Sequence, residues 1–204
     1  LSSLHQSSLG SMWLLLREKL SALWWSPLLP IFFLVTAVAG GLCMVILVSV
    51  LAAKAFGRPV RARLLANLGR GAAGFLLLYG ALKFLDLLVA GELGLLFSEG
   101  ILSLLFWIEI LVGIVAPVVI FSLPRVRETG AGLLGGAVVG LLGLAVNRAN
   151  VSMFAIWRPS GTVYRPHWVE VAILAGAVAA AVLVFSLAAR FLPMLGPVEG
   201  EHES

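Results

Sequence analysis

The chain has 204 residues, of which 61% are hydrophobic and only 12% are charged. Soluble domains usually carry about 25% charged residues, so this chain has too few charges to cover a surface exposed to water. Several of its apolar stretches also exceed the 18 or so residues that mark a bilayer span. The composition therefore excludes a soluble fold and indicates an integral membrane protein.

The net charge of +4 does not indicate a nucleic-acid partner, because most basic residues fall in short connections beside apolar segments. The single cysteine, Cys43, lies in an apolar run and cannot form a disulfide or a cysteine-ligated cluster within this chain. The three histidines, His5, His167 and His202, fall outside the predicted spans, so no histidine pair can hold a b-type haem. We expect no haem or iron-sulfur cluster here and assign any metal centre to a partner.

Residues 1–26 are predicted to form a segment at the outer membrane face. Apolar residues near helical spacing over residues 7–25, with Arg17, Glu18 and Lys19 among them, predict an amphipathic helix in the interface. The sequence opens at Leu1 without an initiator Met, a basic leader region or a small-residue cleavage site. We expect it to be part of a longer polypeptide.

Five apolar segments follow in residues 27–192, and a polar tail covers residues 193–204. The expected fold is all-α: an integral membrane helical bundle of about five transmembrane helices, preceded by the interfacial helix. In the fourth segment glycines recur every four residues, at Gly132, Gly136 and Gly140, which predicts close packing against a neighbouring helix. The predicted spans are about 27–53, 71–90, 100–123, 130–146 and 169–189.

The distribution of charge and aromatic residues predicts the topology. Alternate connections place eight Lys and Arg residues on one side, chiefly in residues 54–70, and five on the other. The first side is predicted to be cytoplasmic. The opposite side gathers an aromatic belt, which supports the same orientation: Trp13, Trp24, Trp25, Trp157, Tyr164 and Trp168.

Three ionisable residues fall inside predicted spans, where each costs about 2.5 to 3.5 kcal/mol on insertion scales. Lys83 and Asp86 are three residues apart on one helical face, with Tyr79 on the same stripe, so we expect Lys83 and Asp86 to pair. Glu109 has no partner within its own helix and must pair with another helix or be protonated. The candidates for a proton relay are Tyr79, Lys83, Asp86 and Glu109. The alternative is a structural ion pair between helices.

Two short polar clusters lie at the predicted outer side, His5-Gln6-Ser7-Ser8 and Asn147-Arg148-Ala149-Asn150. Either cluster is compatible with ordinary helix capping. Together with Tyr164, Trp168 and Glu170 they could instead form a small-molecule pocket that has polar donors and an apolar wall.

The stretch from His5 to Ser11, His-Gln-Ser-Ser-Leu-Gly-Ser, and the Trp25-Ser26-Pro27-Leu28-Leu29-Pro30 segment resemble the NrfD/PsrC family, specifically its HybB-type membrane subunits. The family is that of polysulfide reductase membrane subunits and of the membrane subunits of periplasmic hydrogenases and other respiratory complexes. The resemblance covers nearly the whole chain but only the C-terminal half of a HybB-type protein. Weaker matches are Lys83-Phe84-Leu85-Asp86, Glu109 with Pro117, Asn147 to Val151, and Tyr164 to Glu170.

The resemblance implies a membrane anchor in the bacterial cytoplasmic (inner) membrane that contains no cofactor and reacts with menaquinone or ubiquinone. The anchor would pass electrons between the quinone pool and a periplasmic iron-sulfur or multihaem subunit, itself linked to a hydrogenase-like or molybdopterin-like catalytic subunit. Further transmembrane helices would come from a companion chain or a missing half. The candidate quinone-binding residues are His5, Gln6, Ser7, Arg148, Asn150, Tyr164 and Trp168.

His5 is the preferred proton donor to a quinone oxygen, because imidazole titrates near neutral pH. Arg148 and Asn150 would polarise the other carbonyl, while Asp86 and Lys83 would relay protons. The alternative from another class is an ion- or proton-translocating transporter module in which Lys83, Asp86 and Glu109 line the path without redox chemistry. A third, weaker alternative is a scaffold that only anchors a complex.

Overall fold

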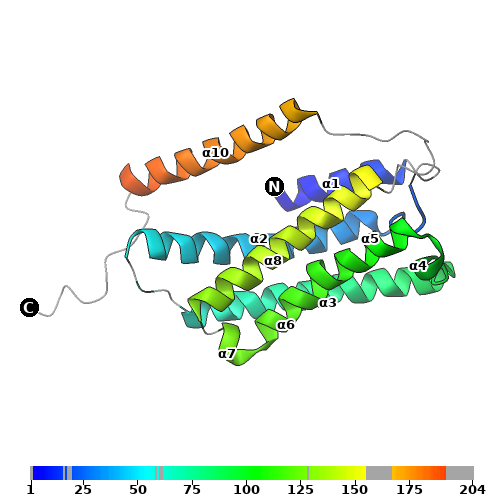
Figure 1. Ribbon diagram of the computed structural model, residues 1–204, viewed down its shortest axis with the longest axis horizontal. Helices are drawn as coiled ribbons and strands as arrows, with labels where there is room; N and C mark the ends of the chain where they lie inside the picture. The colour runs from blue at the N-terminus through cyan, green and yellow to red at the C-terminus, as the bar shows by residue number, and fades with distance from the viewer. Residues whose placement is uncertain are drawn as a thin grey trace, which may run out of the picture. The chain divides into compact units, whose positions relative to one another are not determined.

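The structure is a computed structural model that describes residues 2–15, 17, 20–57, 59, 62–127, 129–154 and 167–191. It divides into two units, residues 1–162 and residues 163–204. All regular secondary structure in the described residues is helical, as predicted (Figure 1). Within these described ranges, five helices are long and apolar enough to cross a membrane, which confirms the predicted multi-pass helical bundle.

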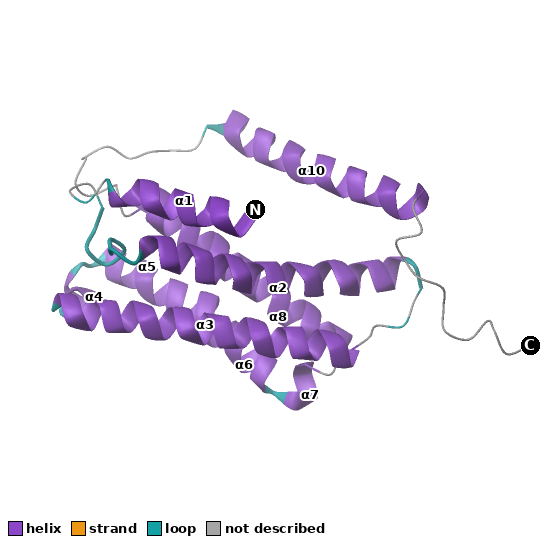
Figure 2. Cartoon of the chain, turned by 180° about the vertical axis from the view of Figure 1, so that it is seen from behind, coloured by secondary structure: helices purple, strands orange, loops and turns teal. Residues whose placement is uncertain are grey.

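The first unit holds four of these spans, and each runs antiparallel to the one before it (Figure 2). The third span is α5, the π-helix η1 and α6 in succession, and the fourth is α8 followed by the π-helix η2. The elements are α1 (Ser2–Leu14), α2 (Leu29–Ala55), α3 (Ala62–Ala90), α4 (Leu95–Ser98), α5 (Ile101–Ile110), η1 (Leu111–Val115), α6 (Ala116–Ser122), α7 (Pro124–Arg127), α8 (Gly130–Ala149) and η2 (Asn150–Phe154).

This alternation gives the unit two ends. The start of α2, the end of α3, the start of α5 and the end of η2 lie at one end, which we call the Trp24 end. The end of α2, the start of α3, α7 and the start of α8 lie at the other, which we call the Arg70 end. The charge distribution predicts that the Arg70 end faces the cytoplasm, and this orientation stays a prediction.

The amphipathic helix predicted over residues 7–25 is wrong in its position and extent. Helix α1 begins at Ser2 and ends at Leu14, and turns and irregular backbone precede α2 among the described residues. Helix α1 packs against α2, where Gly10 is buried on the first turn of α2. A Cβ at Gly10 would lie 2.8 Å from the Cα of Pro30, so only glycine permits this approach. The side chains of Leu20, Leu23 and Trp24 are buried in the bundle rather than spread along an interfacial face.

The second and fourth spans are longer than the sequence predicted. Helix α3 begins at Ala62, nine residues before the predicted start at residue 71. A segment of mixed basic and apolar residues extends the helix beyond its apolar core. The fourth span continues through η2 to Phe154, so residues 147–150 are helical rather than part of a loop. In the third span, Pro117 has no N–H to bond the carbonyl four residues before it, and the turn that precedes it is the π-helix η1.

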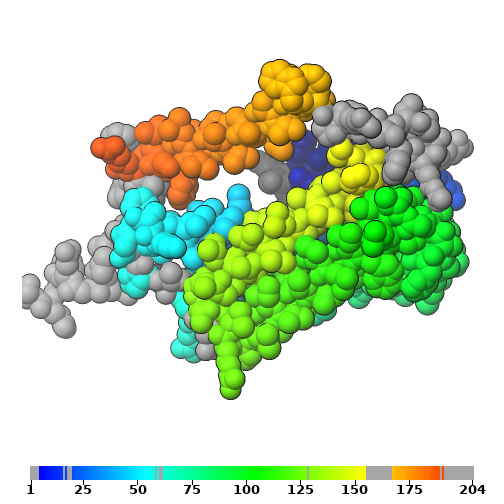
Figure 3. Space-filling view, in the orientation of Figure 1, coloured from blue at the N-terminus to red at the C-terminus, as the bar shows by residue number. Residues whose placement is uncertain are grey.

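The glycines of α8 let its neighbours approach closely, as the spacing predicted. A Cβ at Gly136 would lie 2.7 Å from the ring of Phe121, and one at Gly140 would lie 3.0 Å from Cys43 Sγ. Two approaches are closer: a Cβ would lie 1.9 Å from the carbonyl oxygen of Val126 at Gly132, and 2.1 Å from the Cα of Gly113 in η1 at Gly143. The neighbours of this glycine face come from within the chain. Figure 3 shows α8 and the α5–α6 helix side by side on one face.

The second unit contains one described helix, α10 (Trp168–Phe191), which is the fifth candidate span. It begins with Glu170 in its first turn and ends with Arg190 in its last, where each charge opposes the helix dipole favourably.

Candidate functional site

The centre of the first unit is a carboxylate, Glu109 on α5, whose side chain is 1% exposed. It is the ninth residue of its span, so at 1.5 Å per residue it lies about 12 Å from the Trp24 end. A charge at this depth costs several kcal/mol unless partners surround it. The contacts of its two oxygen atoms therefore decide what the residue can do.

Three side chains bond to Oε1 of Glu109. Lys83 Nζ lies 2.5 Å away and forms an ion pair, and Tyr79 OH donates at 3.0 Å. Asn147 Nδ2 donates at 2.8 Å and also bonds the Tyr79 hydroxyl at 2.9 Å. Tyr79 and Lys83 are four residues apart on α3, so one helical face supplies both donors.

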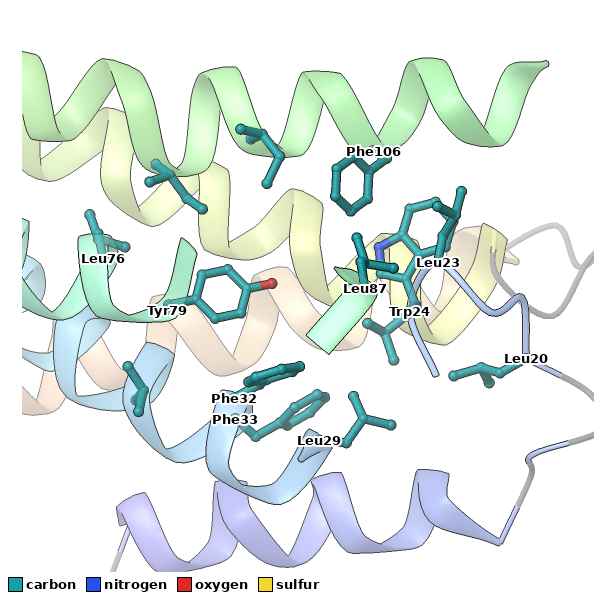
Figure 4. Packing of buried hydrophobic residues seen from close by; sticks show 14 of the residues in the cluster. Leu20, Leu23, Trp24, Leu29, Phe32, Phe33, Leu76, Tyr79, Leu87 and Phe106 are labelled. Carbon is teal, nitrogen blue, oxygen red and sulfur yellow. The ribbon is translucent and has the colours of Figure 1, made fainter. Parts of the chain in front are cut away.

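Two further donors bond to Oε2. Trp24 Nε1 and Asn150 Nδ2 each lie 2.8 Å from this oxygen, from the segment before α2 and from η2 respectively. In Figure 4 the indole nitrogen of Trp24 and the hydroxyl of Tyr79 point toward one another across the core, on the two sides of the carboxylate that they bond. We call these six residues the Glu109 network: Trp24, Tyr79, Lys83, Glu109, Asn147 and Asn150.

The network complements an ionised carboxylate. The two oxygens of a carboxylate offer about four lone-pair sites, and five donors converge on them. A protonated Glu109 would lose the ion pair with Lys83 and part of the acceptor capacity that these five donors use. The expectation that Glu109 pairs with another helix is met, and its donor shell argues against a role as proton carrier.

The side chain of Lys83 is enclosed as completely as its partner. It is 4% exposed, and its ammonium lies 4.7 Å from the ring centroid of Phe106 and 5.9 Å from that of Trp24. Aromatic faces stabilise a desolvated ammonium, so these rings add to the ion pair. The predicted pairing of Lys83 with Asp86 is therefore wrong: the longer reach of lysine brings its charge to the fully buried carboxylate on α5.

Arg148 fixes the network from outside it. Its Nη1 donates to Asn147 Oδ1 at 2.8 Å, which orients the amide so that Nδ2 faces Glu109. Its Nη2 donates to Thr36 Oγ1 at 2.9 Å, and the guanidinium lies 3.7 Å from the ring centroid of Phe33. Arg148 thus holds α8 to α2, and its N–H groups donate to other side chains of this chain.

Asp86 lies beside the network but outside it. It is partly buried, and no described side chain bonds to it. It lines a small cavity together with Lys83, Tyr79, Trp24 and Trp25. The cavity measures about 10 Å³, which is room for about one water molecule. Trp25 Nε1 is buried without a partner among the described residues, so a water here would find a donor.

The surface at this end is acidic. Glu92 follows α3 by two residues, and burial together with the nearby charge of Asp86 raises the pKa of its carboxyl, an effect that Arg17 opposes. The guanidinium of Arg17 itself lies 4.5 Å from the ring centroid of Trp25. The carboxyl groups of Glu92 and Asp86 therefore lie near enough for their charges to interact, and only Asp86 lines the cavity.

The site residues predicted on α1 form no hydrogen bond with this network among the described residues. On α1, His5 is exposed and Gln6 and Ser7 are partly buried, and among the described residues no hydrogen bond joins them to Arg148 or Asn150. Trp168 begins α10 in the second unit and is 72% exposed. Tyr164 lies outside the described residues.

Sequence reasoning missed Trp24 and Asn147 as members of the network. It placed Trp24 in an interfacial belt, whereas the residue is 3% exposed and bonds a charge. Asn147 and Asn150 were placed in a loop because the apolar pattern stops at Val146. Their spacing of three residues would have placed both on one helical face, had the span been extended.

Comparisons with known proteins agree with the resemblance. Residues 13–156 match the family described as "Polysulphide reductase, NrfD". Three relatives match 96 to 98% of the chain and 51 to 53% of their own length. They are a protein of Nitratidesulfovibrio vulgaris named only "Protein" at 34% identity, the "Probable Ni/Fe-hydrogenase 2 b-type cytochrome subunit" of Escherichia coli at 32%, and the "Menaquinone reductase, integral membrane subunit" of N. vulgaris at 29%.

The chain thus spans about half the length of the curated relatives it matches. No solved structure matches it. The family match covers more than half of the chain and includes every residue of the Glu109 network. The chain is a multi-pass membrane protein that belongs to the NrfD family.

Proposed function

We propose that the chain is a quinone-binding anchor subunit of a respiratory oxidoreductase complex in the bacterial cytoplasmic membrane. It passes electrons between a periplasmic iron-sulfur or multihaem partner, linked to a hydrogenase-like or molybdopterin-like catalytic subunit, and menaquinone or ubiquinone. The observation that carries the proposal is the buried Glu109 network with Asp86 and a water-sized cavity beside it, near one end of the spans. The names of two relatives, which refer to a hydrogenase and to menaquinone reductase, support it.

Quinone reduction takes two electrons from the partner and two protons, and yields the quinol. The cavity of about 10 Å³ is far smaller than the roughly 300 Å³ or more of a typical ligand pocket, so the quinone ring does not enter it. We place the ring on the outside of the first unit beside α1, next to His5, Gln6 and Ser7. Tyr164 and Trp168 remain candidates for its outer wall.

Within this proposal Asp86 transfers protons, whereas the Glu109 network and Arg148 have a positioning and electrostatic role. Asp86 exchanges protons with the quinone through water in the cavity, because no described side chain bonds to its carboxylate. Lys83 and Glu109 stay charged and set the electrostatic field around that water. Arg148 and Asn150 position Glu109 instead of contacting the quinone. Tyr79 links Lys83, Glu109 and Asn147.

Turnover measurements on the whole complex test the proposal. Asp86→Asn and His5→Ala should each lower quinone-linked turnover by about a hundredfold or more, which is the lower limit for loss of a proton-transfer group. Activity of the catalytic partner with an artificial dye should be unchanged. Glu92→Gln is the matched control, since it removes an acid at the same end outside the cavity. A parallel loss of dye activity, or full quinone turnover in both variants, would contradict the assignment.

The second candidate is an ion- or proton-translocating module without redox chemistry, and the buried ion pair beside a water-sized cavity also fits it. The two candidates differ in quinone content. Complex purified in mild detergent should carry extractable quinone in the first case and none in the second.

A further inference from the structure

A second polar site lies at the Arg70 end, remote from the Glu109 network. A recess of about 620 Å³ opens between the start of α3 and α7, which lie side by side in both ribbon views (Figures 1 and 2). Three arginines and one asparagine supply its polar lining. The residues around it are Ala62, Arg63, Ala66, Asn67, Arg70 and Arg127.

The charge at this end is uniformly positive among the described residues. Lys54 lies in the last turn of α2, and Arg125 on α7 adds a positive charge to those of the three recess arginines. The described acids of the first unit, Asp86, Glu92, Glu99 and Glu109, all lie in the half of the unit toward the Trp24 end. The described residues of the Arg70 end therefore carry positive charge only; Glu128, which follows Arg127 in the sequence, lies outside the described residues.

Two of the three arginines of the recess, Arg70 and Arg127, bond to protein oxygen atoms and keep further donors. Arg63, Asn67 and Arg70 follow one another at four- and three-residue spacing on one face of α3, and Arg70 Nη1 bonds Asn67 Oδ1 at 3.3 Å. Arg127 is 8% exposed, and its Nη1 bonds the carbonyls of Phe121 and Ser122 at 3.3 and 3.4 Å. A guanidinium has five N–H donors, so these bonds fix each fork without exhausting it.

An apolar recess of about 450 Å³ adjoins the basic one. Arg63 and Asn67 line both, and Ala62 and Leu64 complete the apolar recess. Leu64 is 57% exposed on the surface of α3. A basic hollow beside an apolar one, at the end of a membrane span, has the shape and chemistry of a phospholipid site.

We propose that this recess binds the phosphate group of an anionic phospholipid, with an acyl chain lying along the apolar recess beside Leu64. The planar forks of Arg63 and Arg70 match a phosphate bidentately, and Arg127 closes the site from α7. A free phosphate would use the arginines but leave the apolar recess uncovered, so the lipid accounts for both hollows. The site is independent of the quinone proposal.

Lipid titration of the whole complex tests this inference. The complex is stripped of lipid in mild detergent and titrated with dioleoyl phosphatidylglycerol, and the bound adducts are counted by native mass spectrometry. Each arginine near a bilayer surface contributes about fivefold in affinity, so Arg63→Gln with Arg70→Gln should weaken binding about 25-fold. Arg127 is left unchanged because it also holds the end of α6.

Two further variants separate the site from general charge and from misfolding. Replacing Arg63 and Arg70 by lysine keeps the charge and should retain most of the binding. Arg125→Gln removes one charge at the same end outside the recess and should change affinity less than twofold. Dioleoyl phosphatidylcholine, which is neutral overall, should bind at least tenfold more weakly than the anionic lipid.

Several results would overturn the proposal. Unchanged affinity in the double glutamine variant would show that the lipid binds elsewhere. An equal loss in Arg125→Gln would assign binding to the general field of this end. Displacement of the lipid by excess inorganic phosphate would indicate a free-phosphate site, and equal binding of phosphatidylcholine would exclude recognition of charge.

Discussion

Removal of the negative charge of Glu109 should be strongly destabilising. Glu109→Gln keeps the shape of the side chain but leaves the ammonium of Lys83, 4% exposed, without a counter-ion. It also replaces one carboxylate oxygen by an amide NH2 group, which faces the N–H and O–H donors of the network. Breaking a buried ion pair from one side costs about 3 to 5 kcal/mol, and we expect a loss in this range.

A double variant separates the charge from the packing. Lys83→Met with Glu109→Gln removes both charges, so it should recover about 2 kcal/mol or more relative to the sum of the single variants. Asp86→Asn is the control: no described side chain bonds to Asp86, and its cost should stay below about 1 kcal/mol.

The assay is unfolding of the purified protein in mild detergent by increasing fractions of SDS, followed by Trp fluorescence and circular dichroism. The free energies of the four proteins form a double-variant cycle. A cost below about 1 kcal/mol for Glu109→Gln, or a double variant no better than the sum of the singles, would refute the buried ion pair as the centre of the fold.

Three other predictions follow from particular contacts. Trp24→Phe keeps an aromatic ring but loses the hydrogen bond to Glu109, so the free energy of unfolding should fall by about 1.5 to 3 kcal/mol, and a change below about 0.5 kcal/mol would contradict the bond's role. Gly143→Ala should destabilise by about 1 to 3 kcal/mol because its Cβ would lie 2.1 Å from Gly113, whereas Gly135→Ala, which meets nothing within 4 Å, should not. A cysteine at Gly57 should react with membrane-impermeant thiol reagents only from the cytoplasm, and a cysteine at Ser3 only from the periplasm; the reverse pattern would invert the topology.

The number and order of the spans could be predicted from sequence because the bilayer fixes the length of an apolar helix. The limits of the spans could not, since helices continue past the apolar core wherever polar side chains find partners inside the bundle. Asn147 and Asn150 illustrate this: their polarity indicated a loop, yet the amide nitrogen of each donates to Glu109 on another helix. Hydropathy contains no information on such partners.

The buried charges could be found from the sequence, but their pairing could not. Spacing within α3 favoured Lys83 with Asp86, because i, i+3 neighbours are visible in one sequence. The actual partner, Glu109, is 26 residues away and is defined only by how α3 and α5 pack. Trp24 is farther still, 85 residues from the carboxylate that it bonds, and no local pattern could indicate that contact.

Photoaffinity labelling of the whole complex in native membranes tests the quinone-binding role most directly. An azido-naphthoquinone is activated by light, and the labelled peptides are identified by mass spectrometry. We predict label in peptides of the Trp24 end, those that contain His5, Trp25 or Asp86, and its displacement by excess menaquinone. Label confined to partner subunits or to residues 54–70 at the Arg70 end, or label that menaquinone does not displace, would contradict the proposed role.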